Sequence, residues 1–331
     1  ADNNTAVGKD SLSANTTGER NTGIGVCALN NSTTYVNNTA VGYHALKSNS
    51  ANDNTAIGCG TMQCATTGNV NAGVGSLSLC ANTTGSYNTA MGVPALRSNT
   101  TGSNNTAFGF SALNANTTAS NNTAVGLCSM ALNTTGTLNT AVGQTSLKSN
   151  TEGSCNTAMG GLALNQNTTG LKNTALGTCT LKSNTTADNN TAVGLCALLG
   201  ATTGGANTGI GVNSLKCLTT GSSNTAVGTS AGLNITEGTN NLALGKSALV
   251  FTTTGDHNIA LGEDSVRCNT TGNYNIGIGQ NALLKSTTNN NTAIGVESAA
   301  CTTTGFGTAV GYRAMKANTT SSGNTAMGFE A

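Results

Sequence analysis

The chain has 331 residues, a formal net charge of +1, 3% aromatic residues and no Trp. Large aromatic side chains supply much of the buried area in a compact domain, so this composition excludes a thick globular core and favours a thin fold that buries small residues. With 8% charged residues, the chain also lacks the basic surface of a nucleic-acid-binding protein. No apolar run approaches about 18 residues, so we expect no transmembrane segment.

The chain is an array of one repeat. The glycine of the motif Asn-Thr-Ala-Val-Gly recurs every 17 residues, with three spacings of 16. In chain order these glycines are Gly8, Gly25, Gly42, Gly58, Gly75, Gly92, Gly109, Gly126, Gly143, Gly160, Gly177, Gly194, Gly211, Gly228, Gly245, Gly262, Gly279, Gly295, Gly311 and Gly328. Self-similarity at a fixed period predicts stacked units. We therefore expect about twenty coils in a single continuous array over residues 1–331.

Each coil is predicted to contain one short extended segment. The copy at residues 88–104 reads NTAMGVPALRSNTTGSN and serves to number coil positions 1 to 17. Glycine and poor helix formers interrupt every copy, which argues against a helix, whereas β-branched residues beside Gly and Asn turns favour strands. The predicted fold class is all-β, a parallel β-solenoid (β-roll) of 17-residue coils.

Position 1 is Asn in nineteen of the twenty copies. Identical amides stacked from coil to coil can hydrogen-bond along the array. We therefore predict a structural asparagine ladder, whose members include Asn4, Asn21, Asn38, Asn88, Asn105, Asn122, Asn139 and Asn156.

The apolar positions are 4 and 9. Position 4 is always aliphatic, Met or Phe, and position 9 is nearly always Leu or Met. Position 2 is Thr in most copies but becomes Leu242, Ile259 and Ile276 in three consecutive ones, as expected if it shares a face with position 4. We predict that positions 2, 4 and 9 face inward, and that the small residues at positions 3 and 8 allow close backbone approach.

Position 12 carries Asn-x-Thr sequons, and Thr doublets follow at positions 13 and 14. The candidate N-glycosylation sites are Asn15, Asn82, Asn99, Asn116, Asn133, Asn167, Asn184, Asn269 and Asn318. The alternative is that Asn and Thr occur there because they suit turns. Adjacent residues of an extended segment point to opposite faces, so at most one Thr row should face water.

Eleven cysteines recur mainly at positions 7 and 11. Only neighbours in adjacent coils can bond within the chain, which leaves Cys179 with Cys196 and Cys64 with Cys80 as candidate disulfides. The others are interpreted as free thiols, with bridges between subunits as the alternative. Paired Cys-x-x-Cys spacings are absent, so no zinc site is predicted.

Chemistry-bearing residues are sparse. His44 and His257 lie more than two hundred residues apart and are interpreted as solvated, as are Glu263 and Asp264. Neither a calcium loop nor a phosphate-binding loop occurs. We expect no enzyme activity, no metal and no cofactor.

The pattern N-T-A-V-G-x-x-A-L, followed by N-T-T-G, resembles the head repeats of trimeric autotransporter adhesins, with their related N-S-V-A-I-G pattern. It is also similar to repeat regions of bacterial surface proteins and of phage or viral tail fibres. The resemblance covers the whole chain, although the coil here is longer than the usual head repeat. It implies a left-handed parallel β-roll, commonly a homotrimer, used for adhesion.

The predicted function is a non-enzymatic extracellular structural fibre or adhesin segment, secreted or on the cell surface, with its leader already removed. The expected partner is the chain itself, in a homo-oligomer or a head-to-tail filament, with a host cell, matrix or carbohydrate surface as a further partner. Two alternatives remain open: an ice-binding solenoid that uses Thr columns, and the shaft of a phage or viral tail fibre.

Overall fold

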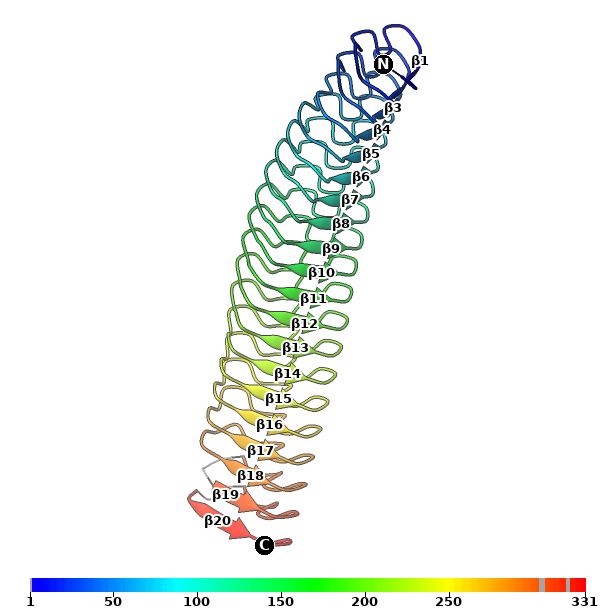
Figure 1. Cartoon of the computed structure of the whole chain (residues 1–331). Coiled ribbons are helices and arrows are strands. Elements are labelled where there is room, and N and C mark those ends of the chain that lie inside the picture. The colour runs from blue at the N-terminus through cyan, green and yellow to red at the C-terminus, as the bar shows by residue number, and fades with distance from the viewer. Residues whose placement is uncertain (1, 304–306, 320–321) are drawn as a thin grey trace. The chain divides into compact units, whose positions relative to one another are not determined.

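The computed structural model describes residues 2–303, 307–319 and 322–331, and it divides into two compact units, Ala1–Thr169 and Gly170–Ala331. Each unit has ten short strands, one to a coil, and the described residues contain no helix (Figure 1). The strands of the first unit are β1 Thr5–Val7, β2 Thr22–Ile24, β3 Thr39–Val41, β4 Thr55–Ile57, β5 Ala72–Val74, β6 Thr89–Met91, β7 Thr106–Phe108, β8 Thr123–Val125, β9 Thr140–Val142 and β10 Thr157–Met159. Those of the second are β11 Thr174–Leu176, β12 Thr191–Val193, β13 Thr208–Ile210, β14 Thr225–Val227, β15 Leu242–Leu244, β16 Ile259–Leu261, β17 Ile276–Ile278, β18 Thr292–Ile294, β19 Gly307–Val310 and β20 Asn324–Met327.

Successive strands within each unit pair in parallel and in register. Thr106 lies opposite Thr123, and Thr191 lies opposite Thr208, each one coil apart. Every coil position therefore becomes a column of like residues at the strand spacing of about 4.8 Å. The all-β parallel solenoid predicted from the sequence is confirmed.

Left-handed backbone conformations turn each coil. Positions 7, 9 and 17 have positive φ at residues other than glycine, as at Leu77 (59°), Leu79 (50°) and Tyr87 (58°). Position 5 has a larger positive φ, which requires glycine. Gly109 has a φ of 134°, and a Cβ there would lie 2.5 Å from the carbonyl oxygen of Gly126 in the next coil. The marker glycine is thus required by both the turn and the close approach of the next coil.

The interior of each coil is filled by positions 3 and 9. Leu113 and Ala107 are fully buried, and the position-9 side chains Leu12, Leu46, Leu96, Met130 and Leu164 are also buried, while Met315 is half-buried. A left-handed conformation costs a leucine about 1–2 kcal/mol, which its burial offsets. The prediction that position 9 faces inward is confirmed.

The prediction that positions 2 and 4 face inward is wrong. Strands such as β7 have a buried middle residue and exposed or half-buried ends, so position 3 points inward and positions 2 and 4 point outward. The space at position 3 admits only a small side chain. At Gly23, which occupies position 3, an added Cβ would lie 2.6 Å from the Ser11 hydroxyl and 3.3 Å from the Leu12 side chain.

Position 1 forms a buried column of amides. The Asn105 Nδ2 donates to the carbonyl of Ala119 in the same coil (2.9 Å), and its Oδ1 accepts the backbone N–H of Asn122 in the next coil (3.0 Å). The same link from a side-chain oxygen to the next position-1 N–H joins Asn4 to Asn21, Asn21 to Asn38, Asn88 to Asn105, Asn122 to Asn139 and Asn139 to Asn156. The column both closes each coil and ties it to its neighbour.

Candidate interaction surface

The outward strand face consists of the side chains at positions 2 and 4 of each coil. Position 4 leaves large apolar side chains in water: Val7 is 57% exposed, Phe108 52% and Ile210 39%. The two positions hold no charged residue anywhere in the chain. A repeated apolar surface of this kind is unusual on a soluble protein and indicates a contact surface.

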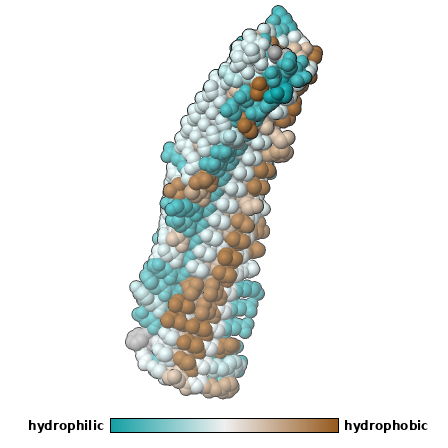
Figure 2. Space-filling model, viewed as in Figure 1, coloured by the Kyte–Doolittle hydropathy of each residue, from teal (hydrophilic) through white to brown (hydrophobic). Residues whose placement is uncertain are grey.

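Position 6 widens the apolar surface on the far side of the turn glycine. In the first unit Tyr43 is 53% exposed and Phe110 57%, and in the second Leu195 is 49% exposed. Figure 2 shows hydrophobic side chains gathering over β15, β16 and β17, where position 2 changes from Thr to Leu or Ile. The outward strand face is therefore most apolar at these three coils.

Elsewhere on the coil surface, positions 13 and 16 are bonded from coil to coil. Thr83, at position 13, donates its hydroxyl to the carbonyl of Thr100 (3.0 Å), while Thr84 beside it is exposed. The prediction that at most one row of the Thr doublet faces water holds for such pairs but not throughout, since Thr16 with Thr17 and Thr270 with Thr271 are exposed together. At position 16, Ser103 Oγ accepts the backbone N–H of Ser86 (3.0 Å), which explains the frequent Ser, Asn and Asp there.

A second buried amide column at position 12 supports the structural alternative to glycosylation for most of the sequon asparagines. Asn99 Nδ2 donates to Asn82 Oδ1 (2.7 Å) and to the carbonyl of Gly102 (2.8 Å). The sequon asparagines with no exposed surface are Asn82, Asn99, Asn116, Asn133, Asn167, Asn184 and Asn269, whereas Asn15 and Asn318 are half-buried. A sugar on Nδ2 would occupy the coil interior and break the column, so the seven buried sequons are structural and not acceptor sites in the folded chain.

All eleven cysteines are free thiols, so the two predicted disulfides are not formed. Cys179 and Cys196 share a column, and side chains of one column keep the strand spacing of about 4.8 Å, longer than the Cβ separation of a disulfide. Cys64 donates its backbone N–H to the carbonyl of Cys80 (3.1 Å). Burial, followed by the nearby Cys64, raises the pKa of the Cys80 thiol, which keeps it protonated.

Both histidines stack on tyrosine rings. His44 stacks on Tyr43 with ring centroids 3.8 Å apart, and His257 stacks on Tyr274 at 4.9 Å. Glu263 and Asp264 form surface ion pairs with Lys246 (3.1 Å) and Arg267 (3.4 Å). In the described part of the chain, no three His, Cys, Asp or Glu side chains come together as metal ligands.

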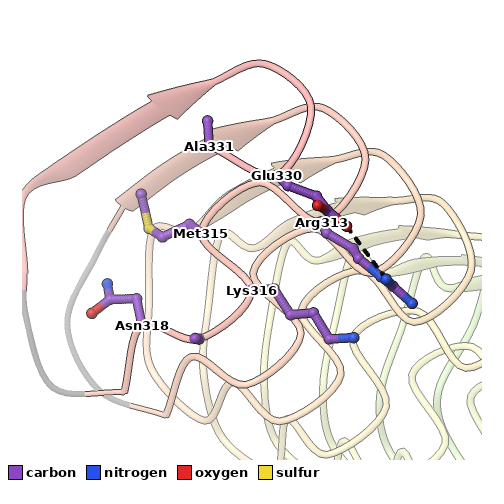
Figure 3. Close-up of a pocket in the computed structure, with 7 residues that line it drawn as sticks. Arg313, Met315, Lys316, Asn318, Glu330 and Ala331 are labelled. Carbon is purple, nitrogen blue, oxygen red and sulfur yellow. Dashed lines mark hydrogen bonds and ion pairs between the residues drawn. The ribbon is translucent and has the colours of Figure 1, made fainter.

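Depressions occur in the described part of the second unit. Figure 3 shows the first, where Arg313 pairs with Glu330 (3.4 Å) beside Lys316, Met315 and Asn318. Hydrogen bonds from Lys316 and then Arg313 hold the pKa of Glu297 below its usual value, so these charges already have partners. The second depression surrounds Phe251, between the thiols of Cys217 and Cys268, and is mainly apolar.

No protein-family model matches the chain, and no curated protein matches it. Among the described residues, no helix is long and apolar enough to cross a membrane. The repeated outward strand face is therefore the strongest structural indication of function.

Proposed function

We propose that this chain is a non-enzymatic structural segment of an extracellular fibre or adhesin, and that it works by associating with copies of itself. The observation that carries the proposal is the outward strand face, with an uncharged apolar column at position 4 of every coil. Within the described ranges, the histidines lie in ring stacks, Glu263 and Asp264 lie in surface ion pairs, and no three His, Cys, Asp or Glu side chains come together.

The interior of each coil supports a mechanical role. The position-1 asparagines, most of them buried, recur in all but one copy and position 9 is Leu in most copies, so each coil is stabilised mainly by its neighbours. Such an array presents one surface many times at a fixed spacing. Adhesion to a cell, matrix or carbohydrate surface would then gain strength from many weak contacts acting together.

Electron microscopy of the full-length chain tests this proposal. We expect particles joined side by side or in filaments, as in an adhesin head or a tail-fibre shaft. Dispersed single particles that bind neither one another nor cells would contradict it.

Ice binding is a second candidate, because the outward strand face also carries a Thr column. Thr174, Thr191 and Thr208 lie in register at position 2 beside the aliphatic column of position 4, and this gives a regular array of hydroxyl and methyl groups. A thermal hysteresis assay separates the candidates. Strong activity from a monomeric chain would favour ice binding over the fibre.

A further inference from the structure

One part of the outward strand face differs from the rest. At β15, β16 and β17, position 2 is aliphatic and lies in the same outward face as the aliphatic position 4. We define the β15–β17 patch as the side chains of Leu242, Leu244, Ile259, Leu261, Ile276 and Ile278.

The patch is continuous. Leu242 lies opposite Ile259, and Ile259 lies opposite Ile276, in parallel register, and the position-4 side chains form a second row beside them. All six side chains are half-buried because they stack on one another, and the residues that separate the rows, such as Ala260, point inward and are buried. The adjoining position-4 residues Val227 (37% exposed) and Ile294 (39%) extend the apolar row on both sides.

We propose that the β15–β17 patch is the centre of an interface between two copies of this chain. The inference rests on the proposed self-associating function and names the part of the surface that holds the copies together. An apolar centre within a more polar surround is the usual anatomy of a protein interface, and here Thr columns and the Lys246–Glu263 ion pair (3.1 Å) supply the surround.

The period of the face favours a second copy as the occupant. Its rows repeat at the strand spacing of about 4.8 Å, so another face of the same repeat can match it coil by coil. Positions 2 and 4 of the second unit bear no charge, which gives no attraction for an anionic membrane or nucleic acid.

The available area also suits such an interface. Ten coils at about 4.8 Å, each about 10 Å wide along its three-residue strand, give roughly 480 Å² per copy. Two copies would bury about 1,000 Å², near the lower limit for a specific interface. An interface of that size needs a well-packed apolar centre, and three consecutive Thr-to-aliphatic changes provide it.

The test uses the residue that other coils carry at the same place. The variant Leu242→Thr/Ile259→Thr/Ile276→Thr restores the usual Thr at position 2, so the coils should still form. The matched control, Leu176→Thr/Val193→Thr/Ile210→Thr, makes three aliphatic-to-Thr changes in consecutive coils of the same face, none of which adjoins the patch. Circular dichroism and thermal midpoints check the fold of both full-length variants.

Sedimentation velocity over a range of concentrations measures association. We expect the patch variant to associate about 100-fold more weakly than the unchanged chain, and the control to lose about 10-fold or less. If both variants lose the same amount of association, or if the patch variant associates as strongly as the unchanged chain, the patch is not the centre of the interface. Either result would leave the proposed self-association in place. A full-length chain that stays monomeric at every concentration, or that binds neutral lipid vesicles as a monomer, would overturn both.

Discussion

Removing one side-chain amide from the position-1 column should lower the local free energy of unfolding, and the hydrogen bonds that are lost set the size of this change. In Asn105→Ala, the backbone N–H of Asn122 loses its acceptor, while the carbonyl of Ala119 keeps a second donor, Asn116 Nδ2 (3.0 Å). A buried donor without a partner costs about 1–3 kcal/mol, and the lost Nδ2 bond adds about 1 kcal/mol. We expect a loss of about 2–4 kcal/mol.

Hydrogen exchange of the full-length chain measures this loss where it occurs. The Asn122 amide should exchange about 30- to 1,000-fold faster in the variant, since each 1.36 kcal/mol corresponds to a factor of ten. The control Thr101→Ala removes an exposed position-14 side chain and should change stability by about 0.5 kcal/mol or less. If the two variants exchange alike, the asparagine column does not stabilise the coil.

Three further outcomes follow from the geometry. Gly109→Ala should destabilise the first unit by about 3 kcal/mol or more in urea unfolding. The control Gly161→Ala, where an added Cβ meets nothing within 4 Å, should not lower the free energy of unfolding. Equal effects of the two substitutions would contradict the requirement for glycine at the turn. Folded chain incubated with an N-glycosylating enzyme should carry no sugar at Asn99 by mass spectrometry, because that amide is buried, and occupancy there would contradict the second amide column. Cys80 should react more slowly with iodoacetamide than the exposed Cys64, since its raised pKa lowers the thiolate fraction, and a faster Cys80 would refute this.

Much of the fold could be predicted from the sequence because one period governs every level of it. The 17-residue spacing predicts the register of the strands. Position 1 was recognisable as an amide column because it is Asn in nineteen of the twenty copies. The inward orientation of position 9 could be predicted because this position is nearly always Leu or Met. These features depend on repetition, which a single sequence displays in full.

Which face of each short strand points inward could not be predicted. A period of two places positions 2 and 4 on one face and position 3 on the other, but it does not say which face is inward. Hydrophobicity favoured Val125 over Ala124, yet Ala124 is the buried one. The left-handed turn at position 9 brings a leucine such as Leu113 (φ 51°) into the coil interior, where position 3 must be small. Leucine rarely adopts a left-handed conformation, so the sequence does not predict this turn.

The burial of the asparagines at position 12 could not be predicted for a related reason. Asn99 belongs to a sequon whose surface exposure depends on the direction in which the turn points. The turn points it inward, onto Asn82 and Gly102. A clue was present in the seven successive copies from Asn82 to Asn184 that all carry Asn at this position.

We propose that the outward strand face contacts other copies of the chain. Sedimentation equilibrium of the full-length chain tests it most directly, because the mass of one chain is 32.6 kDa. We predict that the measured mass rises with concentration to a whole multiple of that value. A mass of one chain at every concentration would contradict the account.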